Sequence, residues 1–188
     1  MAICAICRAE TSEVFVQKDS YAYVRCPECR FVFLDPMPDP EALSRIYNED
    51  EGAINATEYP KARSRMRRAM LKSLGLWRYY VGRDALDIGC GGGFVAGAMQ
   101  KLGARASGID ISRDSIVYAT AQFPKAAFFN ETFDAFLARG WQFGFLYSSE
   151  VIDHIGEVQD YMRFLAGVAA PGAYLYMTTP DMEHPTVP

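Results

Sequence analysis

A cluster of glycines follows a short apolar stretch at residues 85–93, which read ALDIGCGGG. Glycine lets the backbone turn sharply and approach a ligand closely, because no Cβ blocks the way. A helix that starts after such a turn points its free N–H groups at whatever lies above it. The sequence therefore predicts a ligand-binding turn at the carboxyl end of a buried strand.

Neighbouring residues discriminate between two classes of cofactor for this turn. A dinucleotide-binding turn has the pattern Gly-x-Gly-x-x-Gly. Gly89 and Gly91 fit this pattern, but Phe94 stands where the third glycine belongs. Asp87, two residues before the first glycine, would repel a phosphate and suits a positively charged ligand. S-adenosylmethionine (SAM) carries an ammonium and a sulfonium group, so the pattern favours SAM over NAD.

Four segments, in this order, resemble the motifs of the class I SAM-dependent methyltransferases. They are DIGCGGG at 87–93, GIDIS at 108–112, FGFLYSSEVIDHI at 143–155, and APGA at 170–173 before a strand that leads to Thr179 and Pro180. The third segment resembles the fourth strand of that fold and the Glu-x-x-x-His segment of one large subgroup. The resemblance covers roughly residues 58–182. It implies an α/β domain with a Rossmann-like, doubly wound sheet that transfers a methyl group from SAM.

Strand and helix patterns alternate after Asp84, as such a sheet requires. We expect strands at 85–88, 105–109, 126–129, 143–147 and 173–178, and helices at 93–102, 113–122, 132–139 and 157–168. Ligands of these sheets bind beyond the carboxyl ends of the strands. The family fold continues after its fifth strand with a helix and an antiparallel hairpin, and nothing after Pro180 could supply them. We therefore expect the C-terminal hairpin to be missing and the fifth strand to lie near an exposed edge, through which copies of the chain could associate.

The resemblance and the strand ends give each candidate cofactor residue a role. Asp110 ends the second strand, where a carboxylate can accept hydrogen bonds from both ribose hydroxyls. A helix N-cap role fits Ser112 better than Asp110, and Cys90 fits a small packing residue better than a nucleophile. The resemblance places Ile111 against the adenine face, Glu131 at the adenine edge, and Asp87 with the backbone of two glycines at the methionine end. The residues expected at the cofactor are Asp87, Gly89, Cys90, Gly91, Asp110, Ile111, Glu131 and Ser148.

Two further residues are candidates for catalysis. Methyl transfer is an in-line displacement at a carbon that the sulfonium already activates, so the protein mainly positions the reactants. A general base helps where the nucleophile must lose a proton, and His154 has a suitable imidazole just after the fourth strand. Glu150 lies four residues earlier and would share a face with it on a helical turn. In the alternative interpretation Glu150 anchors the loop and His154 is a packing residue.

Cysteines in two Cys-x-x-Cys pairs predict a zinc ribbon over residues 1–35. The pairs are separated by a spacing typical of four-cysteine zinc sites, and strand-like segments at 13–17 and 21–25 lie between them. A segment this small cannot fold on an apolar core alone, and bound zinc can supply the missing stability. Two disulfides are an alternative that a cytosolic setting disfavours, and a thioredoxin-like redox pair is another, which needs a βαβ context that this segment lacks. The expected ligands are Cys4, Cys7, Cys26 and Cys29.

A proline-rich segment follows the ribbon and predicts a domain boundary. Three prolines fall at 36–40, and a helical pattern resumes at 40–47. We expect residues 36–57 to form a linker with a helix, and residues 58–188 to form the SAM-binding domain. The order of ribbon, prolines and helix also resembles methyltransferases that carry an N-terminal zinc ribbon.

Composition limits the partners and the location. The 188 residues carry a formal net charge of −4, and no apolar run approaches the ~18 residues that a membrane span needs. We therefore expect no membrane partner and, without a recognisable signal peptide, a cytoplasmic location. Eight basic residues lie between positions 61 and 83. They could form a face that binds RNA or a phosphorylated substrate. Alternatively, they cover the solvated side of a helix whose other side is an apolar stripe of Met66, Met70, Leu74 and Trp77.

Three functions are consistent with the sequence. The favoured one is transfer of a methyl group from SAM to a small-molecule acceptor, by analogy a sugar-linked or other metabolite. The second is an RNA base methyltransferase, in which the ribbon and the basic helix hold nucleic acid. The third is a SAM-binding module without catalysis, since the missing C-terminal hairpin puts activity in question.

Overall fold

The computed structural model describes residues 2–11, 13–18, 21–36, 55 and 57–180. Residue contacts divide the chain into two compact units, residues 1–50 with 155–162 and residues 51–154 with 163–188. The helix expected at 40–47 lies outside the described residues. Among the described residues, no helix is long and apolar enough to cross a membrane.

The N-terminal segment is built from short antiparallel strands. Strands β1 (Ala2–Ile3) and β2 (Glu10–Thr11) pair with each other, and β3 (Val14–Lys18), β4 (Tyr21–Arg25) and β5 (Val32–Asp35) form a three-stranded sheet in that order. The predicted hairpin at 13–17 and 21–25 is confirmed to within one residue. Strand β5 was not predicted, because its apolar residues directly precede the prolines and resemble the start of the linker.

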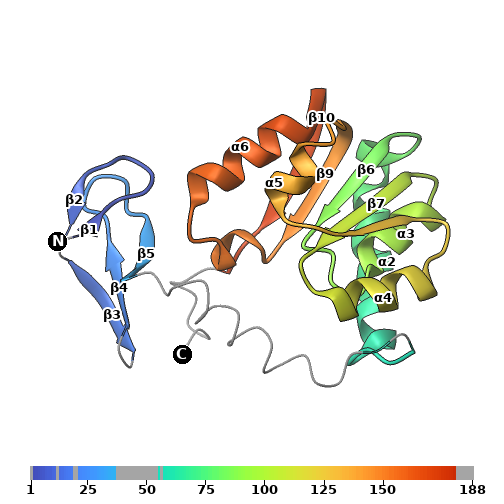
Figure 1. The fold of residues 1–188 in the computed structure, drawn as a ribbon, viewed down its shortest axis with the longest axis horizontal. Coiled ribbons are helices and arrows are strands. Elements are labelled where there is room, and N and C mark those ends of the chain that lie inside the picture. Colours follow the sequence, from blue (N-terminus) through green and yellow to red (C-terminus); the bar gives the residue numbers. More distant parts are fainter. Residues whose placement is uncertain (1, 12, 19–20, 37–54, 56, 181–188) are drawn as a thin grey trace. The chain divides into compact units, whose positions relative to one another are not determined.

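The second unit contains a five-stranded parallel sheet (Figure 1). Its strands are β6 (Asp84–Ile88), β7 (Arg105–Asp110), β8 (Ala127–Asn130), β9 (Phe143–Ser149) and β10 (Ala169–Thr178), and all five predicted strands are confirmed. Their spatial order is β10-β9-β6-β7-β8. The chain thus moves outward from β6 to β8 and returns on the other side through β9 and β10. The order reverses between β6 and β9, and ligands of doubly wound sheets bind at this switch point.

Helices cover both faces of this sheet (Figure 1). Helices α2 (Ala62–Tyr80), α3 (Phe94–Lys101) and α4 (Arg113–Gln122) share one apolar cluster, whereas α5 (Phe133–Leu137) and α6 (Val158–Val168) lie on the opposite face. Phe133 of α5 stacks on Phe164 of α6, with ring centroids 4.6 Å apart. The side chain of Ser112 accepts the N–H of Ser115 at the start of α4, so the predicted N-cap is confirmed.

The expected apolar stripe on α2 is only half right. Met66 and Met70 pack against buried residues of α3 and α4, whereas Leu74 and Trp77 are 53% and 47% exposed. In its second half the helix instead buries Ser73 and Tyr80, whose hydroxyl donates to the carbonyl of Ser73 at 2.8 Å. The buried residues of α2 are Ala69, Ser73 and Tyr80.

Strand β10 forms one edge of the sheet. It is paired with β9 at Ala169 and again from Tyr174 to Thr178, with an irregular stretch between them. The predicted turn at 170–173 therefore falls inside β10, where Gly172 has a φ of 74°. Within the described part of the chain, no strand pairs with the outer side of β10.

Candidate active site and metal centre

The glycine turn after β6 has a backbone that only glycine adopts readily. Gly89, Gly91 and Gly93 have φ values of 65°, 48° and 72°, in the left-handed region that disfavours other residues. A Cβ on Gly89 would also lie 2.6 Å from the side chain of Val151. The turn then leads into α3 at Phe94, as the sequence predicts for a ligand-binding turn.

Asp110 links the glycine turn to the loop after β7. Its two carboxylate oxygens accept the backbone N–H groups of Gly91, at 2.7 Å, and Ser112, at 2.8 Å. Asn130, at the end of β8, donates to the carbonyls of Asp110 and Ile111 and holds the same loop. Sequence reasoning missed Asn130, although it ends the neighbouring strand as Asp110 does. The Ile111 side chain is 68% exposed, which is a suitable surface for an apolar ring.

Asp87 is a buried carboxylate directly below the glycine turn. Only 3% of the residue is exposed, and one carboxylate oxygen accepts the N–H of Ala96 at 2.9 Å. Asp87 therefore satisfies one of the free N–H groups in the first turn of α3. Burial raises the pKa of Asp87 to about 7, against the lowering effect of this hydrogen bond.

A cavity of about 480 Å³ opens at the switch point between β6 and β9. It brings together five of the predicted site residues, namely Asp87, Gly89, Cys90, Gly91 and Glu150. It also contains residues that were not among the predicted site residues, namely Tyr59, Arg65, Arg68, Ala69, Lys72, Gly92, Phe94, Val95, Tyr147 and Ser149. Of these, Arg65, Arg68 and Lys72 belong to the basic stretch that was predicted either to bind RNA or a phosphorylated substrate or to face solvent.

Glu150 follows β9 and is tied to the edge strand β10. Its N–H donates to the carbonyl of Thr178 at 2.9 Å, and the hydroxyl of Thr178 donates to its carboxylate at 3.0 Å. Ser149 and Thr178 also form a hydroxyl–hydroxyl hydrogen bond of 2.6 Å. Glu150 has a φ of 56°, a conformation that is costly for a residue with a side chain and that occurs more often at functional sites.

His154 does not line this cavity. Its side chain is about half exposed, and its Nε2 lies 3.5 Å from the carboxylate of Asp153. The predicted helical turn that would place Glu150 and His154 on one face does not form, because Glu150 is left-handed and the short 3-10 helix η1 spans only Ile152–His154. The prediction of a shared face was therefore wrong.

Of the other predicted cofactor residues, Asp110, Ile111, Glu131 and Ser148 do not line the cavity. The carboxylate of Glu131 forms an ion pair with Arg139, 3.0 Å from its Nε, and this pairing lowers the pKa of Glu131. Ser148 is fully buried inside β9. Cys90 lines the cavity with a buried thiol, and burial raises its pKa well above the usual value, which fits packing and not nucleophilic attack.

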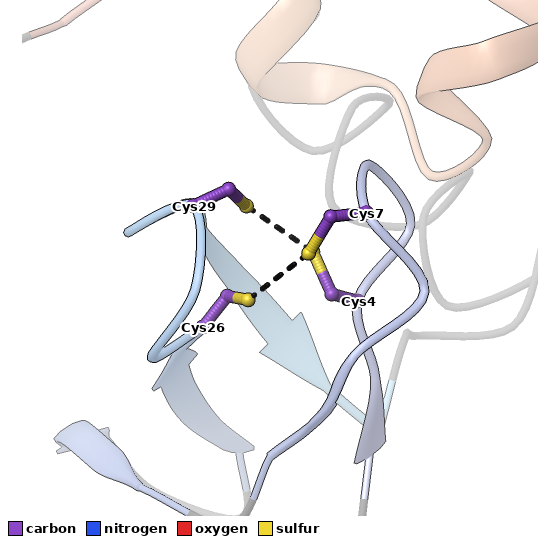
Figure 2. Close-up of side chains that lie close together, drawn as sticks. All are labelled: Cys4, Cys7, Cys26 and Cys29. Carbon is purple, nitrogen blue, oxygen red and sulfur yellow. Dashed lines mark hydrogen bonds between the residues drawn. The ribbon is translucent and has the colours of Figure 1, made fainter.

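The four predicted metal ligands converge in the N-terminal segment (Figure 2). The Sγ atoms of Cys4, Cys7, Cys26 and Cys29 all lie within 4.8 Å of one another, and no disulfide joins them. The Sγ atoms of Cys4 and Cys29 are 3.6 Å apart, and those of Cys7 and Cys26 are 3.4 Å apart. Four thiolates around zinc, each at about 2.3 Å from the ion, have sulfurs roughly 3.8 Å apart. The arrangement therefore fits a tetrahedral zinc ion and leaves no position open for catalysis.

The two cysteine pairs adopt the same backbone conformation. In the first pair, the backbone carbonyl of Cys4 accepts the N–H of Arg8 at 3.0 Å, and the N–H of Cys4 donates to the carbonyl of Ala9 at 2.9 Å. In the second pair, Cys26 forms the same two hydrogen bonds with Arg30 and Phe31, at the same distances. Arg8 and Arg30 share a left-handed φ, 66° and 62°. The segment thus contains two equivalent knuckles that present their thiols to one point.

The doubly wound sheet, the glycine turn and the cavity at the switch point define a Rossmann-like domain. Solved structures of similar fold include the PH0226 protein from Pyrococcus horikoshii OT3, with a TM-score of 0.56 and 19% identity over 71% of this chain and 64% of that chain. The N-methyltransferase NodS from Bradyrhizobium japonicum WM9, solved with S-adenosyl-L-homocysteine (SAH), has a TM-score of 0.51 and 19% identity over 73% of this chain and 70% of that one. These likenesses show the fold.

The sequence itself shows the family. Residues 61–186 match the family described as “Methyltransferase domain”, and the chain belongs to it. Curated relatives include the ubiquinone biosynthesis O-methyltransferases of Methylobacterium sp. (strain 4-46), 28% identical over 102 residues, and of Dinoroseobacter shibae, 30% identical over 104 residues. These matches cover 52% and 53% of this chain but only 41% and 42% of the relatives. The chain therefore spans less than half the length of these relatives.

Proposed function

We propose that this chain transfers a methyl group from SAM to a small-molecule acceptor, such as a sugar-linked or other metabolite. The observation that carries the proposal is the cavity at the switch point, where the glycine turn of β6 meets Glu150 after β9. Membership of the methyltransferase-domain family supports the same reaction. The curated relatives are named for the biosynthesis of a small molecule, ubiquinone, which supports a small-molecule acceptor.

The residues around the cavity fit SAM group by group. Asp110 has lone pairs left for ribose hydroxyls after its two backbone hydrogen bonds, because a carboxylate offers about four acceptor positions. Ile111 beside it offers an exposed apolar surface for adenine. Asp87 and the backbone of Gly89 and Gly91 would hold the ammonium end. When bound, SAM supplies a methyl group on a sulfonium, which activates that carbon for in-line displacement.

Glu150 is the carboxylate best placed to accept a proton from the acceptor. It lines the cavity, and its hydrogen bonds to Thr178 fix its position. A group fixed in this way gives up little conformational freedom in the reaction. We assign the base to Glu150 in preference to His154, which lies outside the cavity lining.

Binding of SAH, measured by isothermal titration calorimetry, tests the cofactor half of the proposal. We expect Asp110→Asn to weaken SAH binding by about 10-fold, since charge-assisted hydrogen bonds to the ribose would be lost. Asp114→Asn is the matched control, because Asp114 is an exposed residue in the first turn of α4. A wild-type chain that does not bind SAH would refute the proposal.

Transfer of labelled methyl groups from SAM to fractions of a metabolite extract tests the catalytic half. We expect labelled small molecules with wild-type protein and at least about 100-fold less label with Glu150→Gln, in keeping with the loss of a general base. Label that appears only in RNA would support the RNA methyltransferase. SAH binding without transfer to any fraction would support the SAM-binding module without catalysis.

A further inference from the structure

One wall of the cavity is formed by three cationic side chains of α2. Arg65, Arg68 and Lys72 are spaced three and four residues apart, so they lie along one face of the helix, and all three line the cavity. Arg67, between two of them in sequence, is exposed and does not line it. The basic stretch of the sequence therefore divides into cations that face the cavity and cations that face solvent.

Two of the three cations are held in place by aromatic residues of the cavity. The guanidinium of Arg65 lies 5.3 Å from the ring centroid of Tyr59, and its Nε donates to the carbonyl of Pro60 at 3.1 Å. The ammonium of Lys72 lies 5.7 Å from the ring centroid of Tyr147. Arg68 has no hydrogen-bond or ion-pair partner within the described part of the chain. Its guanidinium therefore has all five donors available for a ligand.

The charges of the cavity do not balance when SAM is included. The lining contains three cations but only two carboxylates, Asp87 and Glu150. SAM itself carries two positive groups and one carboxylate, so it adds a further positive charge even after its own carboxylate is counted. When Asp110, which the proposed function places at the ribose, is also counted, a site that held SAM would still have one more positive than negative charge. Such a concave, positively charged site attracts an anion.

We propose that the methyl acceptor carries an anionic group, a carboxylate or a phosphate, that is bound by Arg65, Arg68 and Lys72. Guanidinium groups bind both kinds of oxyanion through paired N–H donors, and lysine adds a point charge. The aromatic rings of Tyr59 and Tyr147 line the same cavity and suit an acceptor with a flat or apolar body next to its anionic group. This inference rests on the proposed function, because it takes the cavity to be the place where the acceptor binds.

The test measures binding of small fluorinated probes to the SAH-saturated protein by ¹⁹F NMR. The probes are 4-fluorobenzoate, 4-fluorophenyl phosphate and the neutral analogue 4-fluorobenzamide. We expect at least one anionic probe to bind about 10-fold more tightly than the amide, as a charge-assisted pair would give. The stronger of the two anionic probes distinguishes a carboxylate from a phosphate.

Two variants on neighbouring positions of α2 make the test specific. Arg68→Gln is expected to remove most of the preference for the anionic probe, whereas Arg67→Gln leaves it unchanged. Both positions are exposed, so both variants should fold, which circular dichroism checks.

The outcomes separate this inference from the proposed function. If SAH does not bind the wild-type chain, the proposed function fails and this inference fails with it. If SAH binds but the three probes bind equally, or both variants lose affinity equally, only the anionic acceptor is refuted. If Arg68→Gln weakens SAH binding without changing the preference between probes, Arg68 serves the cofactor carboxylate and the inference is wrong.

Discussion

Replacing Asp87 by asparagine should make the SAH-free protein more stable at neutral and alkaline pH. Burial raises the pKa of Asp87 to about 7 from its ordinary value of 3.8, so the folded state holds a proton over a pH range in which the unfolded state has lost it. The free energy of unfolding must then rise as the pH falls through 7. An asparagine can still accept the N–H of Ala96, the hydrogen bond that Asp87 makes at 2.9 Å, but it carries no charge to bury.

The magnitude follows from the two pKa values. Integrated over the titration, the ionised carboxylate costs the folded state about 4 kcal/mol at pH 8 and about 1.5 kcal/mol at pH 5. The free energy of unfolding of Asp87→Asn should therefore be higher than that of wild type by up to about 4 kcal/mol at pH 8 and about 1.5 kcal/mol at pH 5. The difference between the two proteins thus decreases by about 2.5 kcal/mol between these pH values. The same variant should bind SAH more weakly, because the ligand's ammonium loses its counter-charge.

Urea unfolding followed by tryptophan fluorescence measures this difference. The chain has two tryptophans, Trp77 and Trp141, and both belong to the unit that contains Asp87. Asp84→Asn is the control on the same strand. Asp84 is exposed and pairs with Arg105, which lowers its pKa, so its removal should bring no gain in stability at pH 8. If wild type and Asp87→Asn have equal free energies of unfolding, with equal dependence on pH, then Asp87 is not a buried carboxyl group with a raised pKa.

Three other perturbations have defined outcomes. Cys26→Ser should lower bound zinc from one ion per chain to well below one in elemental analysis, because a closed structural site loses one of its four thiolate ligands. Retention of a full equivalent would refute the site. Gly93→Ala should cost about 3 kcal/mol in urea unfolding, since strain at φ 72° adds to contacts of 2.7 Å with Phe128. The control Gly82→Ala has a similar φ of 71° but open space around it, so it should lower the free energy of unfolding by only about 1 kcal/mol. Equal losses for the two variants would contradict the close packing of Phe128 against Gly93. Thr178→Val should lower kcat about 10-fold through loss of its hydrogen bond to Glu150, and an unchanged kcat would show that this bond does not position the base.

The fold was largely predictable because each element has a local signal. Alternating apolar runs and turn residues marked all five parallel strands, and Ser112 marked the start of α4. Strand β5 was missed because the prolines that follow it resemble a linker. The inward face of α2 was predicted incorrectly in its second half, where a small residue at Ser73 is buried and Trp77 is exposed. Which side of a helix is buried depends on its neighbours in space, and periodicity alone does not determine it.

The candidate site was predictable where a motif is continuous in sequence. Asp87, the glycines and Glu150 directly follow strands, and the carboxyl ends of parallel strands lie at one edge of the sheet. The basic stretch at 61–83 was predicted either to bind RNA or a phosphorylated substrate or to face solvent. Only Arg65, Arg68 and Lys72 of that stretch line the cavity, and this selection depends on how α2 is rotated against the sheet, which the sequence alone does not determine.

The edge position of β10 makes the proposed role of Glu150 depend on correct strand pairing. Thr178 reaches Glu150 only because it is paired with Ser149 across the two strands. A slip of β10 by one residue would turn every side chain to the opposite face of the sheet, and the hydroxyl of Thr178 would no longer reach the carboxylate of Glu150. A misfolded edge could thus keep the glycine turn, the cofactor contacts and most of the core, and still lack a positioned base. The register of β10 against β9 is therefore a requirement for the position of the proposed base.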